Sequence, residues 1–206
     1  MVAPNGARRN QLDHHGLPMT IGQTVAAAAT CQQAGASVLH AHVRDEQGQH
    51  SLDVGLYREL LAEMAMLVPD MLVQITTEAV GQYTTQQQMD LLTTLQPRMA
   101  SVALRELVPT SASEAQAKQF FHWAREVQVH LQIILYDTAD VNYLTHLRLA
   151  GVIPAETNCV LYVLGRYREN LCAEPHELDS FMRPINPELW FTCAFGQHEH
   201  DCMTRA

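Results

Sequence analysis

The chain alternates short apolar runs with segments whose apolar residues recur at helical spacing. The short runs are rich in Val, Ile and Leu, which is typical of strands buried on both faces. A helical or helix-like segment follows each of the first six. The apolar runs are residues 1–5, 37–45, 71–78, 99–106, 129–137, 159–166 and 189–196, and the helical segments are 21–36, 53–68, 84–96, 113–127, 139–151 and 176–183.

This alternation predicts an α/β fold built on a parallel sheet. The first turn between a strand and a helix reads NGARRN, which is not the GxGxxG of a dinucleotide-binding fold, and no Walker A motif occurs. The even spacing favours the (β/α)8 TIM-barrel type. Such a barrel has eight strands and about 250 residues, whereas this chain has 206 residues. We therefore expect one barrel domain over residues 1–206, incomplete, with about seven strands.

Composition narrows the class of protein. Hydrophobic residues make up 47% of the chain, charged residues only 17%, and the net charge is −9. An acidic chain is a poor match for nucleic acid or an anionic membrane, since both attract basic surfaces. The five cysteines include no CxxC pair, so neither a disulfide framework nor a thiolate zinc site is indicated. With no signal peptide or long apolar run, we expect a cytoplasmic protein that acts on a small molecule.

Polar residues gather where the apolar runs end, and two histidines stand out among them. In a parallel barrel the active site forms at the carboxyl ends of the strands. His40 and His42 are two residues apart, so their side chains project from the same face of a strand. Two imidazoles on one face are a common start for a zinc site. The alternative is a pair of buried structural histidines that are held by neighbouring acceptors.

Other strand ends offer weaker candidates. Residues 76–78 (TTE) place two hydroxyls and a carboxylate at the end of a strand, where they could contact a ligand. The alternative is that the threonines are ordinary strand residues that precede a helix cap. Residues 105–106 (RE) could contact a substrate or pair with each other. Residues 198–200 (HEH) repeat the histidine spacing, but they follow a glycine and are expected in a solvated loop.

Taken together, these segments resemble the β-keto acid cleavage enzyme family, whose best-known type is 3-keto-5-aminohexanoate cleavage enzyme. The resemblance runs in order along essentially the whole chain, which makes it far more specific than the histidine spacing. The segments that carry it are APNGARRNQLDHHGLPMT, AGASVLHAHVRDEQGQHSLD, VQITTEAVGQY, VALRELVP, LQIILYD, VLYVLGRY and CAFG.

The resemblance implies a zinc-dependent (β/α)8 barrel, usually a homo-oligomer. It implies an acyltransferase that condenses a β-keto acid with acetyl-CoA to give acetoacetate and a new acyl-CoA. The family's metal ligands match His40 and His42. Its substrate-contacting hydroxyl residues, one at the end of the third strand and one on the fourth, match Thr76 and Ser101. Zinc in such a site would stabilise developing enolate charge.

Two departures bear on the substrate. The aminohexanoate enzyme binds its substrate's amino group with a Glu after the first strand, where this chain has Arg8, and a Glu on the fifth strand is replaced by Ile134. The loss of both carboxylates argues against a cationic substrate, and Arg8 predicts a neutral or anionic one. The phosphates of CoA are expected near arginines such as Arg44 or Arg105.

The last departure concerns the end of the sequence. The family's eighth strand carries a Glu that completes the metal site, together with catalytic groups, whereas this sequence ends at DCMTRA. We therefore expect a barrel that is C-terminally truncated relative to the family, with no assigned third metal ligand or catalytic base. Two alternatives stay open: a metal-dependent hydrolase on a similar barrel, and a catalytically inactive remnant of the enzyme.

Overall fold

The computed structural model describes residues 1–167, 171–182 and 189–206. These residues form two compact units, Met1–Ser101 and Val102–Ala206. In both units strands alternate with helices along the chain, and successive strands of this alternation pair in parallel. The α/β class with a parallel sheet, predicted from the apolar runs, is therefore confirmed.

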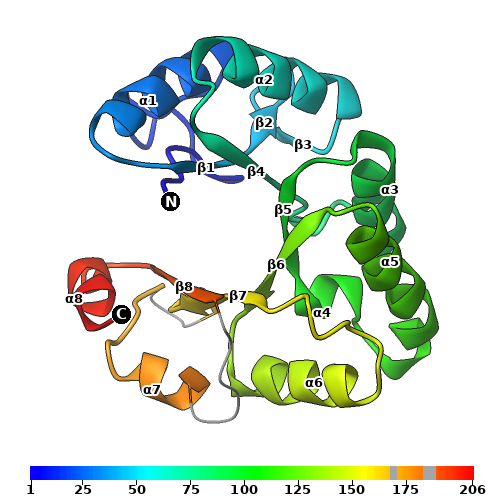
Figure 1. Cartoon of the computed structure of the whole chain (residues 1–206). Coiled ribbons are helices and arrows are strands. Elements are labelled where there is room, and N and C mark those ends of the chain that lie inside the picture. The colour runs from blue at the N-terminus through cyan, green and yellow to red at the C-terminus, as the bar shows by residue number, and fades with distance from the viewer. Residues whose placement is uncertain (168–170, 183–188) are drawn as a thin grey trace. The chain divides into compact units, whose positions relative to one another are not determined.

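In the first unit, β1 pairs with β4, and β4 pairs with β5. The register sets His40 opposite Gln74, and Thr76 opposite Ser101. Helices α1 and α2 lie side by side next to these strands (Figure 1). The elements are α1 (Ile21–Gln33), β1 (Val38–Ala41), β2 (Val43–Arg44), β3 (His50–Ser51), α2 (Val54–Leu67), β4 (Leu72–Thr76), α3 (Thr85–Leu95) and β5 (Met99–Ala103), which runs on into the second unit.

Local sequence explains where these helices begin. Thr20 and Thr84 each open a helix with a capping box, in which the threonine and a glutamine three residues later satisfy each other's backbone N–H groups. Asp53 caps α2 by accepting from the N–H of Leu56 at 2.8 Å. The alternate strand residues Leu39, Ala41 and Ile75 are fully buried and form part of the core of this unit.

In the second unit, β7 pairs in parallel with β6 on one side and with β8 on the other. Its core includes Ile133, Leu135 and Tyr162, which are fully buried. The elements are α4 (Leu104–Leu107), the 3-10 turn η1 (Ser111–Ser113), α5 (Glu114–Glu126), β6 (His130–Leu135), α6 (Thr138–Leu149), β7 (Cys159–Leu164), α7 (Glu177–Met182), β8 (Leu189–Ala194) and α8 (Glu199–Arg205).

Three local expectations need correction. Residues 1–5 form only a single parallel bridge, between Val2 and Leu39, instead of a strand. The predicted run 37–45 is interrupted at His42, and its end pairs with β3 as a short antiparallel ladder. The segment 198–200 is not a loop, because α8 begins at Glu199.

The segment 176–183 contains α7 as expected, although its last residue, Arg183, lies outside the described residues. Within the described ranges, every helix is too short or too polar to cross a membrane.

Candidate metal and substrate site

The two histidines singled out in the sequence converge in the first unit. His40 lies on β1, and His42 follows that strand directly. Their Nε2 atoms are 3.2 Å apart, and the two rings meet edge to face with centroids 5.1 Å apart. The predicted common direction of the two side chains is therefore present, and the two nitrogens face one another.

The His40 ring is oriented by the neighbouring strand. Its Nδ1 lies 2.8 Å from the side-chain oxygen of Gln74, its register partner on β4. Because an amide oxygen only accepts, we assign the imidazole proton of His40 to Nδ1. Its Nε2 then carries a lone pair that is directed at His42. A second residue that fixes the tautomer in this way is typical of metal-ligating histidines.

The backbone of His42 is held by Asn5. The Asn5 side chain donates to the carbonyl of His42 at 2.9 Å and accepts from its N–H at 3.1 Å. Asn5 is itself buried. These paired bonds satisfy the backbone groups of a residue that lies between β1 and β2, so His42 is fixed without being part of a strand.

Burial keeps these imidazoles neutral. Removal from water lowers the pKa of His40 and lowers that of His42 well below the usual value, with further lowering for His42 from the neighbouring His40, His50 and Arg44. Burial also lowers the pKa of His50 to about 4. The His50 Nε2 donates to the carbonyl of Glu78 at 2.9 Å, and its ring lies 5.1 Å from that of His42. Neutral imidazole is the form that binds a metal ion.

The substrate-contacting hydroxyls predicted by the resemblance lie opposite one another on adjacent strands. Thr76 on β4 is the register partner of Ser101 on β5, and both are buried. The Thr76 hydroxyl oxygen accepts from the N–H of Glu78 at 3.1 Å, which leaves its proton free to donate. The Ser101 hydroxyl is buried and has no hydrogen-bond partner. Both residues share the strand face of Gln74 and His40, as the register requires.

A cavity of about 220 Å³ is lined by residues that include Arg8, Arg44 and His50, and the His50 ring lies 5.1 Å from that of His42. Arg8 is more than half exposed, and its Nε is 3.8 Å from a carboxylate oxygen of Glu78. The guanidinium of Arg44 donates to the carbonyls of Gly6, Arg9 and Gly48. The cavity wall is therefore locally cationic in a chain whose net charge is −9.

The imidazole pair has the spacing that a shared metal ion requires. Two nitrogens bound to one tetrahedral zinc at 2.0–2.1 Å are about 3.3 Å apart, close to the 3.2 Å between the Nε2 atoms of His40 and His42. The Nδ1 of His42 is buried and has no partner. If Nε2 of His42 bound an ion, its proton would move to Nδ1. The donor set and its geometry therefore fit a zinc-class ion.

The sequence did not identify all of these residues. Gln74 and Asn5 were missed as supports of the histidines, because strand register and a contact across 37 residues place them there. Arg105, a candidate for CoA, forms ion pairs with Asp137 and Asp140 at 2.7 Å.

Comparison with known families identifies the family of the chain. The model of the beta-keto acid cleavage enzyme family matches residues 1–206. The chain belongs to this family. The resemblance that the sequence motifs carry is therefore confirmed, and the family is described by the cleavage of β-keto acids.

Solved structures support the fold type. The chain resembles type I 3-dehydroquinate dehydratase from Clostridium difficile, with a TM-score of 0.60 and 12% identity over 84% of this chain and 70% of that one. It also resembles 3-dehydroquinate dehydratase from Enterococcus faecalis, with a TM-score of 0.59 and 10% identity over 97% and 81% of the two chains. At these identities the likeness concerns the fold alone, which is of the TIM-barrel type, with six parallel strands in the described part.

Proposed function

We propose that this member of the family is a zinc-dependent acyltransferase whose substrates are a β-keto acid and acetyl-CoA. The carboxymethyl part of the β-keto acid joins the acetyl group to give acetoacetate, and the remaining acyl group leaves as an acyl-CoA. One bond between carbons breaks and another forms, and CoA changes its acyl group, so no oxidant or reductant is needed.

The observation that carries this proposal is the pair of Nε2 atoms of His40 and His42, 3.2 Å apart. Gln74 directs the lone pair of one of them, and Asn5 fixes the backbone of the other. A bound zinc ion would act as a Lewis acid toward the keto oxygen, so that negative charge develops on that oxygen at lower cost. Further ligands from substrate, water or another side chain would complete the coordination.

The hydroxyls of Thr76 and Ser101 are suited to orient the substrate carboxylate. Both have a proton to donate, and both lie on the strand face of the imidazole pair. Their burial keeps water away from the carboxylate, which strengthens each hydrogen bond. We assign them a binding role rather than proton transfer, because an unactivated hydroxyl is a weak base.

Arg8 is assigned to the far end of the substrate. It lines the cavity beside His50 and is only loosely paired with Glu78, so its guanidinium can turn toward an incoming group. A cation at this point favours a neutral or anionic acyl group and disfavours a cationic one. In this proposal the enzyme works as a cytoplasmic homo-oligomer, which size-exclusion chromatography would test.

The test is the CoA-dependent formation of acetoacetate by the zinc-loaded chain, with metal content measured in parallel. We expect His42→Ala to lower the rate at least about 100-fold, since the loss of a ligand exceeds the tenfold to hundredfold effect of an outer-shell change. It should also lower bound zinc by one equivalent relative to the unaltered chain.

The matched control is His130→Ala, which removes an exposed histidine from the start of β6. It should change neither the rate nor the metal content. Full turnover by His42→Ala would refute the role of the imidazole pair. Normal zinc binding without acetoacetate would refute the reaction while leaving the metal site in place.

A further inference from the structure

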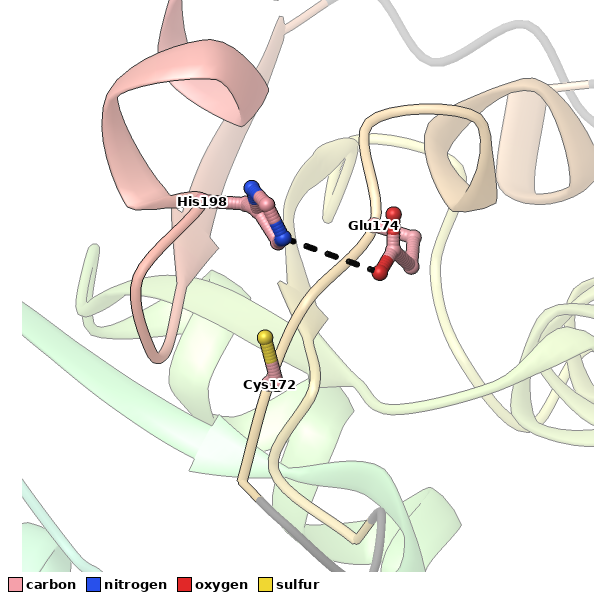
Figure 2. A group of neighbouring side chains, drawn as sticks. All are labelled: Cys172, Glu174 and His198. Atoms are coloured by element: carbon pink, nitrogen blue, oxygen red, sulfur yellow. Dashed lines mark ion pairs between the residues drawn. The ribbon is translucent and has the colours of Figure 1, made fainter.

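A second group of metal-ligating side chains lies in the other unit. Cys172 and Glu174 precede α7, and His198 precedes α8. Each offers one ligand atom, and these three atoms all lie within 4.8 Å of one another. Figure 2 shows the Glu174 carboxylate facing the His198 ring and the Cys172 sulfur directed toward the space between them.

We propose that Cys172, Glu174 and His198 form a binding site for a zinc-class divalent ion, separate from the imidazole pair. The proposal does not depend on the reaction assigned to the protein. It commits to a mixed set of one sulfur, one nitrogen and one oxygen ligand. Thiolate favours zinc over magnesium or calcium, and three protein ligands leave a fourth tetrahedral position for water.

The surroundings of His198 indicate which of its nitrogens would bind. Nε2 lies 3.9 Å from the Glu174 carboxylate, and Nδ1 lies 3.7 Å from the carboxylate of Asp201. The side-chain nitrogen of Gln197 is 3.2 Å from Nε2. Because an amide nitrogen only donates, Nε2 is the acceptor and the ring proton is on Nδ1, facing Asp201. A carboxylate behind the distal N–H is the usual support of a zinc-bound histidine.

In this tautomer the Nε2 lone pair of His198 accepts from the Gln197 amide, and Nε2 also lies 3.9 Å from the Glu174 carboxylate. Two electron-rich atoms that face each other across 3.9 Å attract a cation between them. A proton could fill that role, but the convergence of the Cys172 sulfur on the same space favours a metal ion. Gln197 is exposed, and its amide can turn away when the ion binds.

The backbone brings Cys172 to this place. Ala173 donates its N–H to the carbonyl of Phe195 at 2.8 Å. Gly165 and Gly196, just after β7 and β8, have φ of +77° and +89° and leave no room for a side chain. A Cβ on Gly165 would lie 2.5 Å from the Ala173 nitrogen, and one on Gly196 would lie 2.8 Å from the Cα of Cys172. The segment that carries Cys172 is thus packed against the ends of both strands.

Glu174 is placed by its own helix. Its N–H donates to the side chain of Glu177 at 3.0 Å, at the start of α7. Glu174 and His198 are 43% and 36% exposed, so both side chains can move by the roughly 0.5–1 Å that brings ligand atoms to the spacing of about 3.4–3.6 Å around a tetrahedral zinc. An ion at this site would tie the segments after β7 and β8 together.

The test is titration of the full chain with Co²⁺, which replaces zinc and gives a near-ultraviolet charge-transfer band only when a thiolate binds it. The imidazole pair has no sulfur ligand and cannot produce this band. We expect the band to reach saturation by the time two equivalents of Co²⁺, enough for both sites, are bound and to disappear when Zn²⁺ is added in excess of both sites. It should be absent in Cys172→Ser and retained in Cys31→Ser, which changes a half-buried cysteine of α1.

His198→Gln provides a second test at a partly exposed position where folding is not at risk. It should raise the Co²⁺ dissociation constant reported by the band at least about tenfold. Circular dichroism of each variant checks the fold. A full band in Cys172→Ser, unchanged affinity in His198→Gln, or no band in the unaltered chain would each overturn the proposal.

Discussion

The imidazole pair of the first unit and the Cys172–Glu174–His198 cluster of the second unit are held in different ways. His42 is 5% exposed, and hydrogen bonds that His40 and His42 donate to the side chains of Gln74 and Asn5 hold the pair. Glu174 and His198 are more than a third exposed, and close backbone packing at two glycines sets the position of the segment that carries Cys172 and Glu174. The geometry of the buried site is therefore set by hydrogen bonds with neighbouring polar side chains. The geometry of the half-exposed site is set by the packing of the backbone that carries its ligands.

This difference predicts that the two sites are sensitive to different substitutions. In the buried site, each supporting side chain also satisfies groups that cannot reach water, so its removal costs both stability and ligand geometry. In the half-exposed cluster, water replaces a lost polar contact at little cost, but a displaced backbone moves the ligands. Substitutions that remove one kind of support should damage one region and spare the other.

The largest effect on stability is expected for Gly165→Ala. The new Cβ would overlap the backbone of Ala173 and would require a positive φ. Overpacking and left-handed strain together should lower the free energy of unfolding by about 3 kcal/mol. Urea unfolding measures this loss. The cobalt–thiolate band should also weaken, while metal binding by the imidazole pair should persist.

Gly151→Ala is the matched control. Gly151 has φ of +66° but open space around its Cα, so alanine meets only the backbone strain, about 1 kcal/mol. Equal destabilisation by the two variants would show that the close approach at Gly165 contributes nothing, and the comparison between the two regions would fail.

A smaller loss is expected for Asn5→Ala in the first unit. It leaves the buried N–H and carbonyl of His42 without their partners, which should cost about 2–3 kcal/mol in unfolding free energy. It should also weaken zinc binding by the imidazole pair and leave the cobalt–thiolate band unchanged. Asn10→Ala, at an exposed turn, should cost less than about 1 kcal/mol. A harmless Asn5→Ala would contradict the role given to this residue.

The sequence predicted the presence of the strands β4 to β8 well, because burial on both faces leaves apolar runs that no other element explains. It overestimated residues 1–5, which form a single bridge between Val2 and Leu39. A short apolar stretch forms a strand only where a neighbouring strand pairs with it over several residues. It also missed α8, since the signals of residues 198–205 were dominated by charged and polar residues.

The two ligand clusters were predictable to different degrees. His40 and His42 are two residues apart on one strand face, so local geometry alone brings them together. The positions of Gln74 and His50 depend on strand pairing and on the turn before β3, which the sequence did not reveal. The cluster of Cys172, Glu174 and His198 joins two loops, and no spacing rule connects them.

Gln74→Leu should separate the orientation of the His40 ring from the packing of the core around it. Leucine removes the acceptor that fixes the His40 tautomer, so zinc affinity at the imidazole pair should fall about tenfold to hundredfold. Competition with a chelator measures this change. Gln132→Leu makes the same substitution at a buried position of β6 and should leave zinc affinity at the pair unchanged. The same loss in both variants would indicate a general effect of a buried leucine.

The smallest effect on stability is expected for Arg8→Met. Arg8 is 57% exposed and 3.8 Å from Glu78, so its loss should change the free energy of unfolding by less than about 0.5 kcal/mol. Because Arg8 lines the cavity, KM for an anionic β-keto acid should rise about tenfold with little change in kcat. Arg9→Met removes a neighbouring arginine whose ion pair with Asp13 lies on the surface, and it should alter neither constant. If the two variants had the same kinetics, substrate recognition would lie elsewhere in the first unit, and the cationic wall of its cavity would have no part in choosing the substrate.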